Sequence, residues 1–145
     1  MALQEIQATV QAIKHLSISE ILFLYDIQTV YIEQSDNRKP DAYFLIQNDQ
    51  KTIFLKSTLN ERLIPFVLLH ELGHFFLHGD KTSFSFKLKL HKTKLEKEAN
   101  LFAVLYLLQD VELCDLDIPS YLMQNYNVPA NIAQQCFELM NKNPC

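Results

Sequence analysis

The chain of 145 residues has no tryptophan, only two glycines and only three cysteines. The cysteines are Cys114, Cys136 and Cys145, and none of them belongs to a Cys-x-x-Cys pair. Disulfide frameworks and cysteine-based zinc sites need paired cysteines, so we expect neither of them. We expect the three cysteines to be small buried apolar residues in a reducing compartment, which favours a cytoplasmic location.

The chain also lacks an excess of positive charge and any long apolar run. Its formal net charge is −4 and its isoelectric point is about 5.7, so direct binding to nucleic acid is not expected. Polar residues interrupt every apolar stretch well before the roughly 20 residues that a membrane-spanning helix needs. No secretory signal is visible at the start, and the length suits a single domain over 1–145 without membrane association.

Periodicity in the sequence predicts both helices and strands. Two helices are expected early in the chain, over 2–14 and directly after the Ser17–Glu20 capping box. A central helix would begin somewhere in 60–65 and end at His78. Three more are expected over 93–108, 118–125 and 129–141. Gly79 would end the central helix as a left-handed residue. Strands are expected over 29–34, 42–47 and 51–56, of which the last two flank a polar turn as in a β-hairpin. Residues 83–90 alternate like a further strand, or like a flap beside the substrate.

The segment 68–80, LLHELGHFFLHGD, places ionisable residues in an apolar run. His70, Glu71 and His74 form an HExxH motif. On a helix the two histidines lie about 40° apart and can share one metal ion. Glu71 lies about 100° from His70, where it can reach a water on the metal but is poorly placed as a ligand. The alternative is a pair of helix histidines beside a surface glutamate, but the apolar neighbours would bury this helix, so we predict a catalytic zinc site.

A catalytic zinc ion normally has three protein ligands, so a third one is needed. The candidates are His78, Asp80, His91, Glu96 and Glu98. His78 lies too far along the same straight helix, and Asp80 lacks the turn glycine that a metzincin has before that ligand. As an alternative to a catalytic role, His78 would stabilise the C-terminal dipole of its helix.

Glu96 is the favoured third ligand because it shares a helix face with Asn100 and two alanines. The small residues would let this helix approach the HExxH helix closely. Asn100 would then accept a hydrogen bond from the far nitrogen of a metal-bound histidine. Glu98 points about 160° away from Glu96 on the helical wheel, so we expect either a surface charge there or a partner of the helix dipole in the first turn.

The two motifs together, HELGH followed by FFLHG and then EKEANLFA at 96–103, resemble the ImmA/IrrE family of metallopeptidases. The resemblance covers about 27–108. It implies an α+β, minimal zincin-like fold of the gluzincin type: a small antiparallel or mixed sheet packed on the HExxH helix and a second ligand-bearing helix, with a helical C-terminal part over 111–145. It also implies His70, His74 and Glu96 as zinc ligands, with Glu71 as general base and acid.

The same resemblance implies a function. Members of this family are carried by bacteria and their mobile elements, where they cleave helix-turn-helix repressors and so relieve repression. We therefore expect a zinc-dependent endopeptidase acting on a separate repressor protein. The alternative is a non-proteolytic metal-binding module that acts on a repressor by stoichiometric binding. An oxyanion donor is also expected, for which His78, His91 and Tyr43 are candidates, and the hairpin edge at 42–56 could hold the substrate by strand addition.

Overall fold

The fold is given by a computed structural model, which describes residues 2–36, 38–79, 83–86 and 93–140. The helices are α1 (Leu3–Ile13), α2 (Ile18–Leu24), α3 (Ile64–His78), α4 (Lys94–Leu107), α5 (Ile118–Tyr126) and α6 (Ala130–Met140). The strands are β1 (Ile27–Ile32), β2 (Ala42–Gln47), β3 (Gln50–Lys56) and β4 (Ser83–Phe86). This arrangement confirms the α+β class, and each element lies within a few residues of its predicted position.

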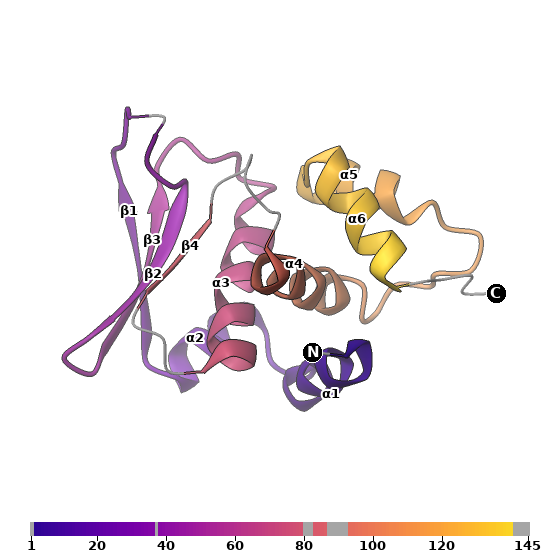
Figure 1. The fold of residues 1–145 in the computed structure, drawn as a ribbon, viewed down its shortest axis with the longest axis horizontal. Coiled ribbons are helices and arrows are strands. Elements are labelled where there is room, and N and C mark those ends of the chain that lie inside the picture. The colour runs from indigo at the N-terminus through magenta and orange to yellow at the C-terminus, as the bar shows by residue number, and fades with distance from the viewer. Residues whose placement is uncertain (1, 37, 80–82, 87–92, 141–145) are drawn as a thin grey trace.

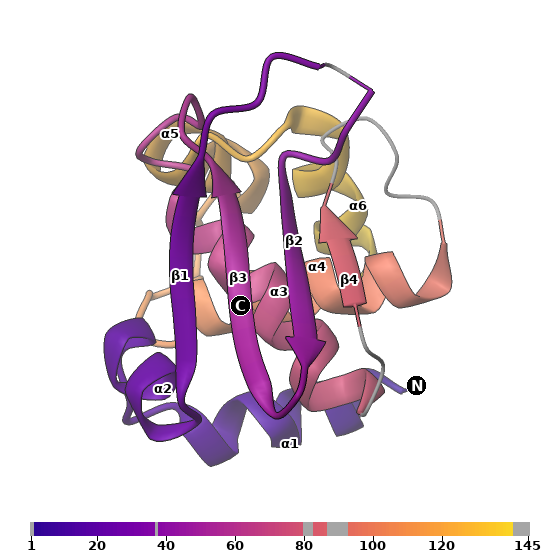
Figure 2. The same ribbon diagram turned by 90° about the vertical axis from the view of Figure 1, so that its left-hand side faces the viewer.

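The sheet is mixed and has the strand order β1-β3-β2-β4. β1 pairs with β3 in parallel, whereas β2 is antiparallel to both β3 and β4 (Figure 2). The hairpin between β2 and β3 turns at Asn48 and Asp49, whose φ angles are 52° and 64°. Two successive positive φ angles are typical of a type I′ turn, which matches the twist of the paired strands.

The helices lie on one side of the sheet, with α3 closest to it (Figure 1). Alternation along the hairpin explains this asymmetry, because one side chain in two points toward α3. The buried residues on that face are Ala42, Phe44, Ile53 and Leu55. On the opposite face Tyr43 stacks on Phe54, with ring centroids 4.7 Å apart.

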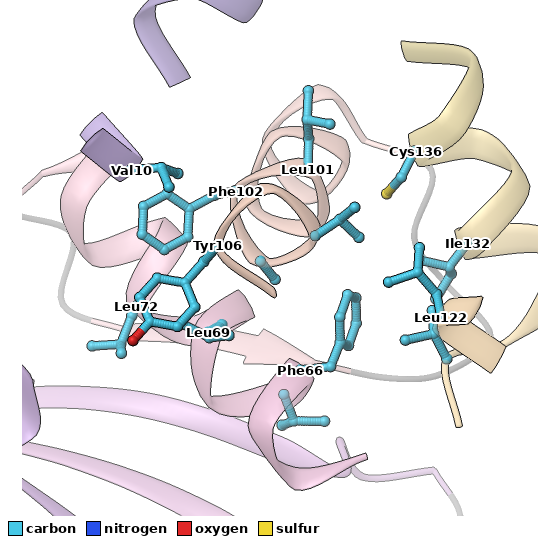
Figure 3. Packing of buried hydrophobic residues seen from close by; sticks show 14 of the residues in the cluster. Val10, Phe66, Leu69, Leu72, Leu101, Phe102, Tyr106, Leu122, Ile132 and Cys136 are labelled. Atoms are coloured by element: carbon cyan, nitrogen blue, oxygen red, sulfur yellow. The ribbon is translucent and has the colours of Figure 1, made fainter. Parts of the chain in front are cut away.

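Helix α3 forms the centre of the molecule and is apolar on most of its surface. Pro65 lies in its first turn, where the missing N–H costs nothing, and the helix ends before Gly79. The φ of Gly79 is positive as predicted, but its ψ of −138° lies outside the left-handed helical region. Phe66, Leu69 and Leu72 of α3 enter the main core between α1, α4 and α5 (Figure 3).

Helix α4 packs directly on α3 at the HExxH motif. Thr93 caps α4 by accepting a hydrogen bond from the backbone N–H of Glu96. A Cβ atom added at Gly73 would lie 3.1 Å from the carbonyl oxygen of Ala99 and 3.1 Å from the ring of Phe102. The absence of a side chain at Gly73 therefore lets the two helices approach closely, which is the approach that the alanines beside Glu96 predicted.

Helices α5 and α6 form an apolar pair beside α4. Asp117 caps α5, and Asn127 ends it in the left-handed conformation with φ of 54°. Cys136 of α6 is free and fully buried, but Cys114 is exposed and disulfide-bonded. The prediction of small buried cysteines without a disulfide is therefore wrong for Cys114, while Cys145 lies outside the described residues. None of the helices in the described part of the chain is long and apolar enough to cross a membrane.

Candidate metal centre

Three metal-binding side chains converge where α4 crosses α3. They are His70, His74 and Glu96, and one potential ligand atom from each lies within 4.8 Å of the others. The Nε2 atom of His70 is 3.3 Å from one carboxylate oxygen of Glu96. The Nε2 atom of His74 is 2.5 Å from the other oxygen. The structure thus brings together the three residues that the sequence suggested as ligands.

The position of each side chain follows from its helix. His70 and His74 are one turn apart on α3, so both rings project toward α4. Glu96 lies in the first turn of α4, and the close contact at Gly73 brings that turn within reach of the histidines. Two helices, each stabilised by its own buried apolar residues, therefore hold the three side chains together.

His70 is oriented by Asn100. Its Nδ1 atom is 2.7 Å from the side-chain oxygen of Asn100, and both residues are fully buried. An amide oxygen only accepts, so Nδ1 of His70 carries the proton and donates. In a neutral ring this leaves a lone pair on Nε2, the atom that faces Glu96. The contact has the geometry expected of a group that orients a metal-binding histidine.

Glu71 is the second residue of the motif and is fully buried. Neither of its carboxylate oxygens has a hydrogen-bond partner among the described residues. Burial raises the pKa of Glu71 well above its ordinary value, and the nearby charge of Glu96 adds to the shift. A buried acid without hydrogen bonds is costly unless the site provides a cation or a bound water.

The electrostatics of His70 and Glu96 agree with a cation site. Burial lowers the pKa of His70, which favours the neutral ring that binds metal. Burial by itself would raise the pKa of Glu96, but the rings of His70 and His74 beside its carboxylate hold that pKa below its ordinary value. Two neutral imidazoles and one carboxylate are a donor set that suits zinc, so the residues present fit a divalent metal.

The other predicted site residues do not join this group. Tyr43 lies on the face of the sheet away from α3, so it does not fit the suggested oxyanion role. His78 turns away from the three ligand-type atoms and contacts His74 and Glu98 instead. His91 and Asp80 lie outside the described residues.

The structure contradicts the expectation that Glu98 is a surface charge or only a partner of the helix dipole. It is only 7% exposed, and one carboxylate oxygen lies 3.0 Å from Nε2 of His78. A helical wheel gives the direction of a side chain around its own helix but not what packs against it. The face of α4 that carries Glu98 is covered too, by His78 at the end of α3. The available signal was the spacing of His78, four residues after His74, which placed another histidine on the same face of α3.

Comparisons with known proteins agree with this geometry. Residues 25–137 match the peptidase family described as the IrrE N-terminal-like domain. The chain is also similar to "Metallopeptidase ImmA" of Bacillus subtilis (strain 168), with 38% identity over 104 residues. That alignment covers 68% of this chain and 59% of the relative, so the chain spans little more than half the length of that protein. The family match includes α3, α4 and all residues of the candidate centre, and the chain therefore belongs to the ImmA/IrrE family that its two motifs predicted.

Proposed function

We propose that the chain is a zinc-dependent endopeptidase in which His70, His74 and Glu96 hold the metal and Glu71 is the general base. The observation that carries the proposal is the buried Glu71 carboxylate beside three converging ligand-type side chains. A merely structural metal site would not need a fourth, unbonded acid at such a position. Family membership supports the same assignment.

The chemistry divides between the metal and the protein. When bound, zinc supplies Lewis-acid polarisation of the scissile carbonyl and lowers the pKa of a water molecule in the open position. Glu71 accepts a proton from the attacking water and then donates it to the leaving amine nitrogen. The raised pKa of Glu71 suits both roles, since a general base and acid works best with a pKa near the working pH.

The substrate would bind in extended form along the sheet. The predicted hairpin edge does not serve, because β2 lies between β3 and β4 and β3 lies between β1 and β2. Among the described strands, β1 and β4 are the outer ones, and β4 also contacts α3. We therefore place the substrate backbone along β4, where an added strand would continue the sheet (Figure 2).

The proposed substrate is a helix-turn-helix transcriptional repressor in the cytoplasm, whose cleavage relieves repression. This part rests on the family resemblance of the motifs HELGH and EKEANLFA. No direct contact with DNA is needed, which agrees with the net charge of −4. The alternative, stoichiometric binding without cleavage, is separated from it by the experiment below.

The test uses zinc-loaded protein, a repressor encoded beside its gene, and the variant Glu71→Gln. The wild-type protein should cleave the repressor, and the variant should be slower by about 10²- to 10⁴-fold, the usual contribution of a general base. The control is Glu61→Gln, the same change at an exposed residue ahead of α3, which should leave the rate unchanged.

Two results would contradict the proposal. Equal cleavage by the wild-type protein and Glu71→Gln would exclude Glu71 as the base. Binding and relief of repression by both proteins, without cleavage by either, would establish the binding module instead. Zinc content measured for every sample ensures that a loss of rate is not a loss of metal.

A further inference from the structure

His78, the last residue of α3, lies in a buried chain of polar groups behind the candidate metal centre. Its Nδ1 atom is 2.9 Å from Nδ1 of His74, and its Nε2 atom is 3.0 Å from a carboxylate oxygen of Glu98. The side chains of His78 and Glu98 are only 4% and 9% exposed. An interaction with the dipole of α3 needs no partner on another helix, so the contact of His78 with Glu98 of α4 requires a further explanation.

Metal binding through Nε2 of His74 requires one particular arrangement of protons in this chain. An ionised carboxylate only accepts, so Nε2 of His78 donates to Glu98. A neutral His78 then has a lone pair on Nδ1, which accepts a proton from Nδ1 of His74. The remaining lone pair of His74 is on Nε2, the atom that faces Glu96. If Nδ1 of His78 donated to Nδ1 of His74 instead, a neutral His74 would carry its proton on Nε2, and this atom could not bind a metal.

The two histidines of the motif are thus oriented in different ways from the same helix. Asn100 of α4 accepts directly from His70. Glu98 of α4 reaches His74 only through His78. Because Glu96 is the third ligand-type residue, one short segment of α4 supplies the carboxylate and both orienting groups.

We propose that His78 and Glu98 are positioning residues, which hold the ring of His74 in the tautomer and orientation that bind the metal through Nε2. The inference rests on the proposed function, in that it requires a metal held by His70, His74 and Glu96. It assigns a role to His78 other than oxyanion donor or dipole partner. It also assigns a role to Glu98, the buried acid that the proposed reaction does not use.

The experiment measures zinc affinity by competition with a chelator of known affinity, without any activity assay. His78→Phe keeps a ring of similar size but removes both hydrogen bonds, and it should weaken zinc binding about 10- to 100-fold, as losses of orienting partners do. Glu98→Gln keeps the shape and should cause a smaller loss in the same direction, because a neutral amide is a weaker acceptor than a carboxylate. His15→Phe, the same change at an exposed histidine, should bind zinc like the wild type.

Coupling between the two positions is the sharper test. If the two residues act as one chain, the double variant should lose little more affinity than His78→Phe alone. The visible absorption spectrum of the Co²⁺-loaded protein should change in His78→Phe and not in His15→Phe, because it reports the geometry of the ligands. Circular dichroism and thermal melting of the metal-free proteins establish that each variant is folded.

The possible failures are distinct. The positioning role would be overturned if His78→Phe bound zinc with wild-type affinity. It would also be overturned if His78→Phe lost zinc affinity while Glu98→Gln lost none. In either case the proposed function would still stand, provided that Glu96→Ala loses zinc affinity. If Glu96→Ala binds zinc as tightly as the wild type, the assigned metal site is wrong, and the positioning role of His78 and Glu98 fails with it.

Discussion

Two interfaces in the helical layer differ in what they bury. The buried polar residues of the described chain all lie on α3 and α4, and they are His70, Glu71, His74, Glu98 and Asn100. The packing of α5 and α6 against the same layer is apolar, with Ile118, Leu122, Ile132, Ala133, Cys136 and Met140 buried (Figure 3). One interface is thus stabilised by burial alone, whereas the other contains groups that burial destabilises.

The comparison shows how a small domain maintains a costly site. Each fully buried large apolar side chain contributes about 1.5–3 kcal/mol, whereas a buried polar group costs free energy unless it is bonded. Even the titratable group of the apolar interface stays neutral, because burial raises the pKa of Cys136 to about 12. We infer that the apolar contacts of α3, α4, α5 and α6 stabilise the fold, while the centre between α3 and α4 depends on its cation.

The largest expected effect on stability is at the apolar interface. Leu122 of α5 is fully buried, and Leu122→Ala should lower the free energy of unfolding by about 2–5 kcal/mol. Zinc stoichiometry should not change, because the residue is not part of the centre. Urea unfolding measures the first quantity and metal analysis of folded protein the second. Leu139→Ala, at a residue of α6 that is 41% exposed, is the matched control and should cost much less. A large loss of zinc in folded Leu122→Ala would show that the two interfaces are coupled.

The next effect concerns the polar interface and removal of the metal. Free zinc at 100 times its dissociation constant should stabilise the protein by about 2.7 kcal/mol, provided that the unfolded chain does not bind it. Chelation should therefore lower the melting temperature of the wild-type protein. Glu96→Ala should lose this difference, whereas Glu138→Ala, at an exposed residue of α6, should keep it. An equal response of both variants to chelation would exclude Glu96 from the metal site.

The smallest effect tests the contact between α3 and α4. Gly73→Ala places a methyl group 3.1 Å from backbone oxygen of Ala99, so the helices must move apart, and we expect a cost of about 1–3 kcal/mol. The same movement should weaken zinc binding by displacing Glu96. Gly79→Ala meets no atom of the described residues within 4 Å, so its cost, about 1–3 kcal/mol, comes only from the backbone conformation at φ of 70° and ψ of −138°, and it serves as the comparison. Unfolding curves and zinc titrations of the two variants distinguish a steric effect at the helix contact from a local backbone effect. Equal zinc affinity in Gly73→Ala and the wild type would show that the centre tolerates a wider spacing.

Much of the fold could be predicted because local patterns were strong. The Ser17–Glu20 capping box, the alternation of the hairpin and the apolar run of α3 each depend on near neighbours, and the structure agrees with them. Tyr43 and Glu98 were misjudged because their surroundings depend on distant segments. Tyr43 lies away from the metal centre because the other face of the hairpin packs on α3. Glu98 is buried because His78 of α3 packs against it.

By itself the sequence determined which residues are capable of the chemistry. Helical geometry puts His70 and His74 on one side of α3, and the two motifs identify the family. Only the tertiary structure decided how these residues are held, because hydrogen bonds across two helices depend on their crossing and spacing. The approach at Gly73 brings α4 close enough for Asn100 to orient His70 and for Glu98 to reach His74 through His78.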